Sequence, residues 1–82
     1  MSDEKLNINL QNKKYVEDNI DNIRNLFNNK YIVVHDRQIE AAFSTYEEAS
    51  RFGVIKFGLD DVFLVYRVED TKSINFVALA SL

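Results

Sequence analysis

The chain has 82 residues, 46% hydrophobic and 28% charged, which predicts one small globular domain spanning residues 1–82. It has no Cys for disulfides or thiolate metal sites, and no apolar run approaches the roughly 18 residues of a membrane span. Its net charge of −3 disfavours binding to nucleic-acid phosphates. With a polar start that lacks a secretory pattern, these features predict a cytoplasmic protein with no membrane partner.

Two segments precede the predicted sheet. Residues 1–11 are polar apart from apolar residues at alternate positions 6, 8 and 10, which predicts either a flexible leader or a short strand. Residues 12–29 are predicted as a helix, with Asn12 as its N-cap. Its apolar stripe comprises Val16, Ile20, Ile23, Leu26 and Phe27. Such a stripe is typical of a helix packed on its own domain; docking on a partner is the alternative.

A β-hairpin is predicted next, with strands at Tyr31–His35 and Gln38–Phe43. Strict alternation would place Ile39, Ala41 and Phe43 on one face of the second strand. The two-residue turn between the strands has Arg37 where Gly is usual, so its type stays open.

A helix is predicted within residues 44–58. Thr45 and Glu48 have the spacing of a capping box, and Gly58 is expected to end the helix with a left-handed conformation. Its inner face would carry Tyr46, Ala49, Gly53 and Phe57. Because Gly inside a helix costs about 1 kcal/mol relative to Ala, we expect close approach of helix and sheet at position 53.

Two more strands are predicted at residues 62–68 and 74–82. The last of them carries no charged side chain, so we expect it to pair with a second copy or another protein. The predicted partner-binding residues are Ile74, Phe76, Val77 and Leu79. The alternative is that the two helices cover this strand from both sides.

These elements predict an α+β fold of order α-β-β-α-β-β. Its sheet would be a small single layer of about three to four strands, mixed or antiparallel, with both helices sheltering one side.

Several of these residues form a shared pattern: Lys-Tyr-Ile-Val-Val at 30–34, Thr-Tyr-Glu-Glu-Ala at 45–49, Phe-Gly at 57–58 and Phe-Leu-Val at 63–65. Over residues 30–66 the chain resembles a family of short, uncharacterised bacterial domains. The matching positions are caps, turns and core residues, so the resemblance implies a ββαβ topology and no particular chemistry. The turn at 36–37 departs from the Gly that is frequent in the family.

Few residues suggest catalysis or metal binding. His35 is the only His, and the adjacent Asp36 would point to the opposite face of the strand. The acidic residues Asp60, Asp61, Glu69 and Asp70 lack the spacing of a calcium loop and are expected in solvated loops. We therefore predict no enzyme, no cofactor and no metal.

The function predicted from these features is that of a protein–protein interaction module. A small accessory or regulatory subunit, such as an antitoxin, an inhibitor or a defence-complex accessory, would fit, and so would a homodimer. The abundance of Asn, Ile and Lys is typical of AT-rich bacterial or phage genomes. The alternative is a small anion- or nucleic-acid-binding domain in which Arg37, Arg51 and Arg67 converge on a polar face of the sheet.

Overall fold

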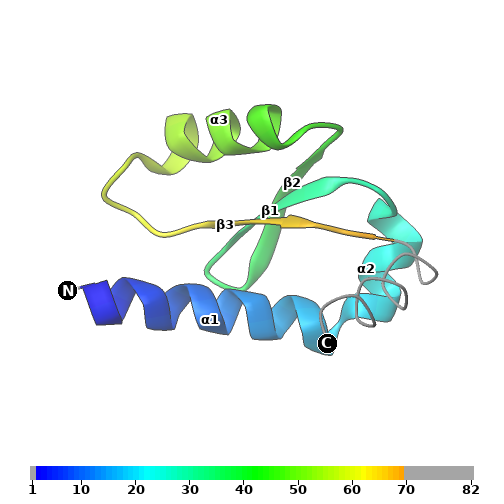
Figure 1. The fold of residues 1–82 in the computed structure, drawn as a ribbon, viewed down its shortest axis with the longest axis horizontal. Helices are drawn as coiled ribbons and strands as arrows, with labels where there is room; N and C mark the ends of the chain where they lie inside the picture. Colours follow the sequence, from blue (N-terminus) through cyan, green and yellow to red (C-terminus); the bar gives the residue numbers. More distant parts are fainter. Residues whose placement is uncertain (1, 70–82) are drawn as a thin grey trace, which may run out of the picture.

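The computed structural model of the chain describes residues 2–69. Within them the elements are α1 (Ser2–Asp18), α2 (Ile20–Phe27), β1 (Tyr31–His35), β2 (Gln38–Phe43), α3 (Tyr46–Phe57) and β3 (Leu64–Arg67) (Figure 1). The three strands form an antiparallel sheet of order β2-β1-β3. The α+β class is confirmed. The predicted strand at 74–82 and its residues Ile74, Phe76, Val77 and Leu79 lie outside the described residues.

The sheet lies between helices on both of its faces. α1 and α2 lie along one face, and α3 covers the other (Figure 1). The expectation that both helices shelter one side is therefore wrong. The reason lies in the central strand β1, where Ile32, Val33 and Val34 are consecutive and fully buried. Because successive side chains of a strand point to opposite faces, such a run requires cover on both sides.

The N-terminal segment is helical, contrary to both predictions for residues 1–11. α1 begins at Ser2 and runs without interruption past Asn12, which is 1% exposed in mid-helix rather than at an N-cap. The side of α1 that carries the buried Asn12 also carries Ile8 and Asn9, and the next buried residue on it is Val16. Because amides interrupt this side, the first half of α1 has no continuous apolar stripe, and hydrophobic periodicity did not reveal it.

A break at Asn19 divides the predicted helix of residues 12–29. The Asn19 backbone N–H donates to the carbonyls of Tyr15 at 3.2 Å and Val16 at 3.1 Å, and its side-chain amide donates to Tyr15 O at 2.8 Å. The Asn19 backbone leaves the helical region with φ −116° and ψ 21°, and its carbonyl then accepts the first hydrogen bond of α2 from Ile23. α2 is therefore a separate helix with its own direction (Figure 1).

The predicted apolar stripe of residues 12–29 is confirmed except at one position. Val16 and Ile23 are buried, and Ile20 and Phe27 pack against them in the core between the sheet and α1–α2. Leu26, by contrast, is 74% exposed.

A β-bulge in β2 overturns the predicted facing of that strand. Val33 pairs with Ala41 but Val34 pairs with Ile39, so Glu40 is the extra residue. As a result Ile39 packs with the α1–α2 core, whereas Phe43 lies on the α3 side. The Glu40 carboxylate lies 3.4 Å from the Lys56 ammonium of α3.

The ends of α3 agree with the prediction. The Thr45 hydroxyl accepts the Glu48 backbone N–H at 3.1 Å and donates to the Glu48 carboxylate at 3.2 Å. Gly58 ends the helix as predicted, and its N–H donates to Val54 O at 2.8 Å. Its φ of 80° favours Gly, but its ψ of 176° is extended and differs from that of the expected left-handed helical conformation. On the inner face, Ala49 and Gly53 are buried as expected.

Two positions on the predicted inner face of α3 are informative. Tyr46 is 56% exposed and so does not belong to the buried part of that face. At Gly53 the close approach is confirmed, because a Cβ there would overlap the ring of Phe63, the residue just before β3.

The last described strand is shorter than predicted, and its side chains alternate between the two faces of the sheet. β3 spans Leu64–Arg67 rather than 62–68. Leu64, Tyr66 and Val68 pack with the α1–α2 core, and Phe63 lies on the α3 side.

Candidate functional site

A buried polar contact joins the tip of the β1–β2 hairpin to α1. The buried Asn12 side chain accepts the Arg37 backbone N–H at its Oδ1, at 2.8 Å, and donates from Nδ2 to Asn9 Oδ1 at 3.2 Å. A buried amide left without partners would cost about 1–3 kcal/mol, so this pairing fixes the hairpin tip on the helix.

The hairpin turn has a backbone conformation that its side chains disfavour. Asp36 and Arg37 have φ values of 51° and 58°, as a type I′ turn requires. Asp tolerates this left-handed region fairly well, but an ordinary side chain there costs roughly 1–2 kcal/mol. The structure thus resolves the turn type that the sequence left open. It also places Arg37 at a position where Gly would be less strained.

A hollow of about 350 Å³ opens beside this contact, between α1, the α1–α2 break and the hairpin tip. We call it the Arg37 hollow; its lining residues are Gln11, Lys14, Tyr15, Asp18, Asn19 and Arg37. Lys14 Nζ lies 3.3 Å from Asp18 Oδ2, so these two charges offset each other. Among the described side chains, no carboxylate lies within ion-pair distance of the Arg37 guanidinium. The described lining of the hollow therefore carries one net positive charge.

A second hollow, also of about 350 Å³, contains the only His of the sequence. This His35 hollow shares Gln11 with the first and is otherwise lined by Ile8, His35, Asp36, Asp61 and Val62. His35 Nε2 lies 2.9 Å from Asp61 Oδ2, and the imidazole is stacked on the Phe57 ring with centroids 3.9 Å apart. The Val62 backbone N–H and then His35 hold the pKa of Asp61 below its usual value.

This His–Asp pair agrees with two sequence interpretations and adds one contact that they did not include. Asp61 lies in an exposed loop, as expected, and it also binds the imidazole across 26 positions of the chain. His35 does lie at the hairpin end, and its carboxylate partner is not the adjacent Asp36. The pair orients the imidazole, but the lining contains no Ser, Thr, Cys or Lys that such a base would activate as a nucleophile.

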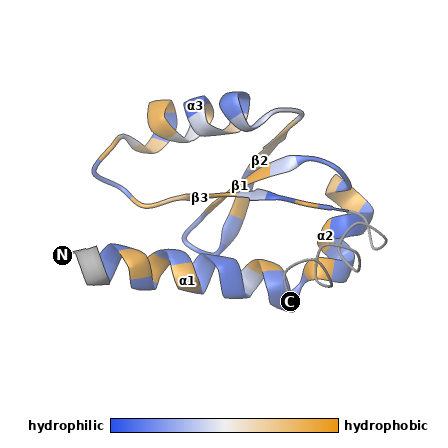
Figure 2. Cartoon of the chain, viewed as in Figure 1, coloured by the Kyte–Doolittle hydropathy of each residue, from blue (hydrophilic) through white to orange (hydrophobic). Residues whose placement is uncertain are grey.

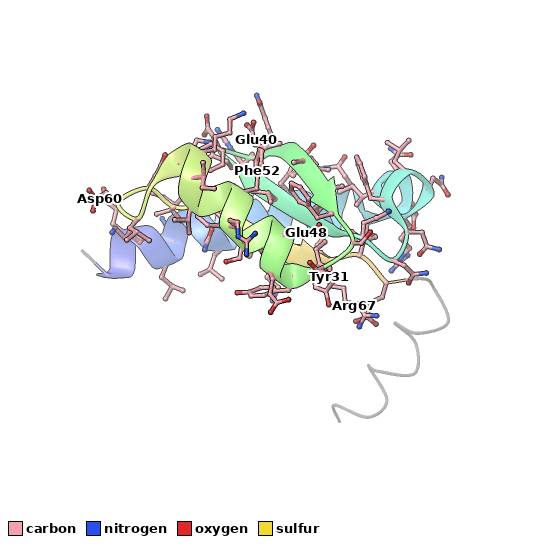
Figure 3. All side chains as sticks on the ribbon, turned by 90° about the horizontal axis from the view of Figure 1, so that it is seen from above. Tyr31, Glu40, Glu48, Phe52, Asp60 and Arg67 are labelled. Carbon is pink, nitrogen blue, oxygen red and sulfur yellow. The ribbon has the colours of Figure 1, made fainter. Side chains whose placement is uncertain are left out.

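The three arginines of the alternative prediction are not brought together. Arg37 lies in the hairpin turn, whereas Arg67 pairs with Tyr31 at the opposite end of β1. Figure 3 shows Arg67 near Tyr31, with the guanidinium 6.0 Å from the ring centroid. Arg51 lies on α3, across the sheet from α1, and both sheet faces are covered. The residues that do gather around Arg37 come from α1 and the α1–α2 break. All of them except Gln11 lie within the predicted helix of residues 12–29, but its contact with the hairpin tip was not predicted.

Two further findings concern the described residues as a whole. No group of three or more His, Cys, Asp or Glu within them is arranged to hold a metal ion. None of the helices in residues 2–69 combines the length and apolar character needed to cross a membrane.

Comparison with known proteins found no matching family model, no similar curated protein and no similar solved structure. The resemblance of residues 30–66 to short bacterial domains therefore stays a prediction.

Proposed function

We propose that the chain is a non-enzymatic protein–protein interaction module, a small accessory or regulatory subunit that docks through the outer face of α1. The observation that carries this proposal is that the first half of α1 has leucines on its exposed side and a buried amide on its inner side. Leu6 and Leu10, which we call the outer leucine pair, are 60% and 53% exposed, whereas Asn12 is buried against the hairpin tip. Figure 2 shows hydrophobic segments of α1 between hydrophilic ones.

The geometry of α1 makes the leucines a pair. Residues four apart lie on one face of a helix, and residues two apart do not. Leu6 and Leu10 therefore share a face, and Leu10 points away from the side that carries Asn12. Burying a Leu side chain is worth about 1.5–3 kcal/mol, which this chain does not gain within the described residues. Apolar anchors at this spacing are how an amphipathic helix enters a groove on another protein.

The non-enzymatic part of the proposal is supported by the His35 hollow. Its imidazole has a carboxylate partner and an aromatic ring against one face, as a structural His does. The partner of the module is either a second copy or another protein. The predicted role of Ile74, Phe76, Val77 and Leu79 in the same contact stays a prediction.

Sedimentation velocity of the full chain, alone and with any candidate partner, tests the proposal. The double variant Leu6→Ser/Leu10→Ser is compared with the control Ile55→Ser, which changes an equally apolar residue on α3 that is 77% exposed. We expect the double variant to lose the complex and the control to keep it, with melting temperatures close to wild type in both. A strictly monomeric wild type that binds no partner, or a complex indifferent to the double variant, would contradict the proposal.

A further inference from the structure

We propose that the Arg37 hollow is a binding site for the carboxylate group of an organic acid whose apolar body rests against Tyr15. This goes beyond the proposed function, because neither residue of the outer leucine pair lines the hollow. Three features of the site support it: its charge, the fixed backbone position of Arg37, and its size.

The charge of the hollow fits a singly charged anion. The Lys14–Asp18 pair is neutral as a whole, and Arg37 adds one positive charge without an ion-pair partner among the described side chains. A guanidinium presents two parallel N–H donors, which match the two oxygens of a carboxylate. A polyphosphate would place several negative charges beside Asp18, and the chain's net charge of −3 further disfavours nucleic acid.

The backbone of Arg37 is fixed before any ligand binds, and its exposed side chain extends from there to line the hollow. Its backbone N–H is held at 2.8 Å by Asn12, which is itself buried. Its φ of 58° is one that Gly adopts without strain, so the turn alone would favour Gly. Strained residues of this kind concentrate at binding sites, where the surrounding structure holds them in place. A binding role for the guanidinium explains an Arg here better than turn formation does.

The lining and volume of the hollow restrict the size and chemistry of the ligand beyond its carboxylate group. At about 350 Å³ it is near the small end of ligand pockets, which suits an acid with a single ring. The Tyr15 side chain supplies an aromatic wall, and Gln11 contributes an amide that can donate to a second oxygen.

Titration of the full chain with benzoate, followed by amide NMR shifts, tests the inference. We expect saturable shifts at the Arg37 and Tyr15 amides in the millimolar range. Benzamide, which has the same shape without the charge, should give none. Arg37→Gly should fold at least as well as wild type and bind benzoate at least tenfold more weakly. Lys14→Gln offers a second variant that leaves the turn intact and should weaken binding severalfold.

Further binding measurements identify the source of the carboxylate and show whether this site is independent of the proposed docking face on α1. A short acetylated peptide ending in Phe is compared as the free acid and as the amide. Tighter binding of the free-acid peptide than of benzoate would assign the group to a polypeptide end, and the reverse order to a free small acid. The Leu6→Ser/Leu10→Ser variant should bind benzoate as wild type does. The inference is overturned if no carboxylate shifts these amides, if benzamide binds equally well, or if Arg37→Gly leaves the affinity unchanged.

Discussion

Replacing Gly53 by Ala is expected to destabilise the protein, although Ala is the better helix former. Ala in place of Gly inside a helix gains about 1 kcal/mol. A Cβ at this position, however, would overlap the ring of Phe63, and forcing extra atoms into a packed site costs typically 1–3 kcal/mol. Phe63 is also packed near the Phe57 ring, at 6.0 Å between centroids, which restricts its escape. We expect a net loss of about 1 kcal/mol.

Urea denaturation followed by circular dichroism measures this loss, which corresponds to a fall in melting temperature of about 4–8 °C for a domain of this size. Phe63→Leu provides the matched background, because the smaller side chain leaves room for the added Cβ. In that background Gly53→Ala should be neutral or stabilising, so the two substitutions should couple. If Gly53→Ala instead stabilises the wild type by the full helix-propensity gain, the close packing of α3 on Phe63 is refuted.

Four other outcomes follow from the same contacts. Asn12→Ala should lower the free energy of unfolding in urea by about 1–3 kcal/mol, since it leaves the Arg37 N–H without its buried acceptor; an unchanged value would contradict this. Arg37→Gly should raise the free energy of unfolding by roughly 0.5–1 kcal/mol. Relief of the strained positive φ in the folded protein should outweigh the extra freedom that Gly gives the unfolded chain. A lower free energy of unfolding would show that Arg37 stabilises the fold. Thr45→Ala should cost about 1 kcal/mol in thermal unfolding through the lost cap of α3, more than Ser44→Ala beside it. The pKa of Asp61 in the folded protein lies below its ordinary value of 3.8, so the ionised carboxylate stabilises the fold above pH 3.8 and loses this effect as the pH falls through the folded pKa. The difference in free energy of unfolding between wild type and Asp61→Asn, measured in urea from pH 7 to pH 2, should therefore shrink at the acid end.

The parts of the fold that follow from local signals could be predicted from the sequence. The hairpin strands have the predicted bounds because β-branched runs on both sides of a two-residue turn specify them. Thr45 and Gly58 delimit α3 through chemistry that acts within one helical turn. Gly53 predicted a close approach of α3 to the sheet, because the stability that Gly costs inside a helix must be offset by closer packing.

The missed parts depend on contacts between distant residues or on polar packing. The apolar residues at 6, 8 and 10 of α1 alternate as those of a strand would, and the buried amide of Asn12 interrupts the helical stripe. The bulge at Glu40 shifts the facing of β2 by one residue, and strict alternation cannot anticipate it. His35 and Asp61 meet only because β1 and the loop after α3 lie together, and the Arg37 hollow needs α1 as its wall.

Site-specific photo-crosslinking in cells that naturally express the protein tests the docking role of α1 most directly. A photo-crosslinking amino acid replaces Leu10 in one form of the full chain and Ile55, on the other side of the sheet, in a second form. We expect one discrete crosslinked species at position 10, either a second copy or a single partner, that is absent at position 55. Equal or no crosslinking at the two positions would contradict it.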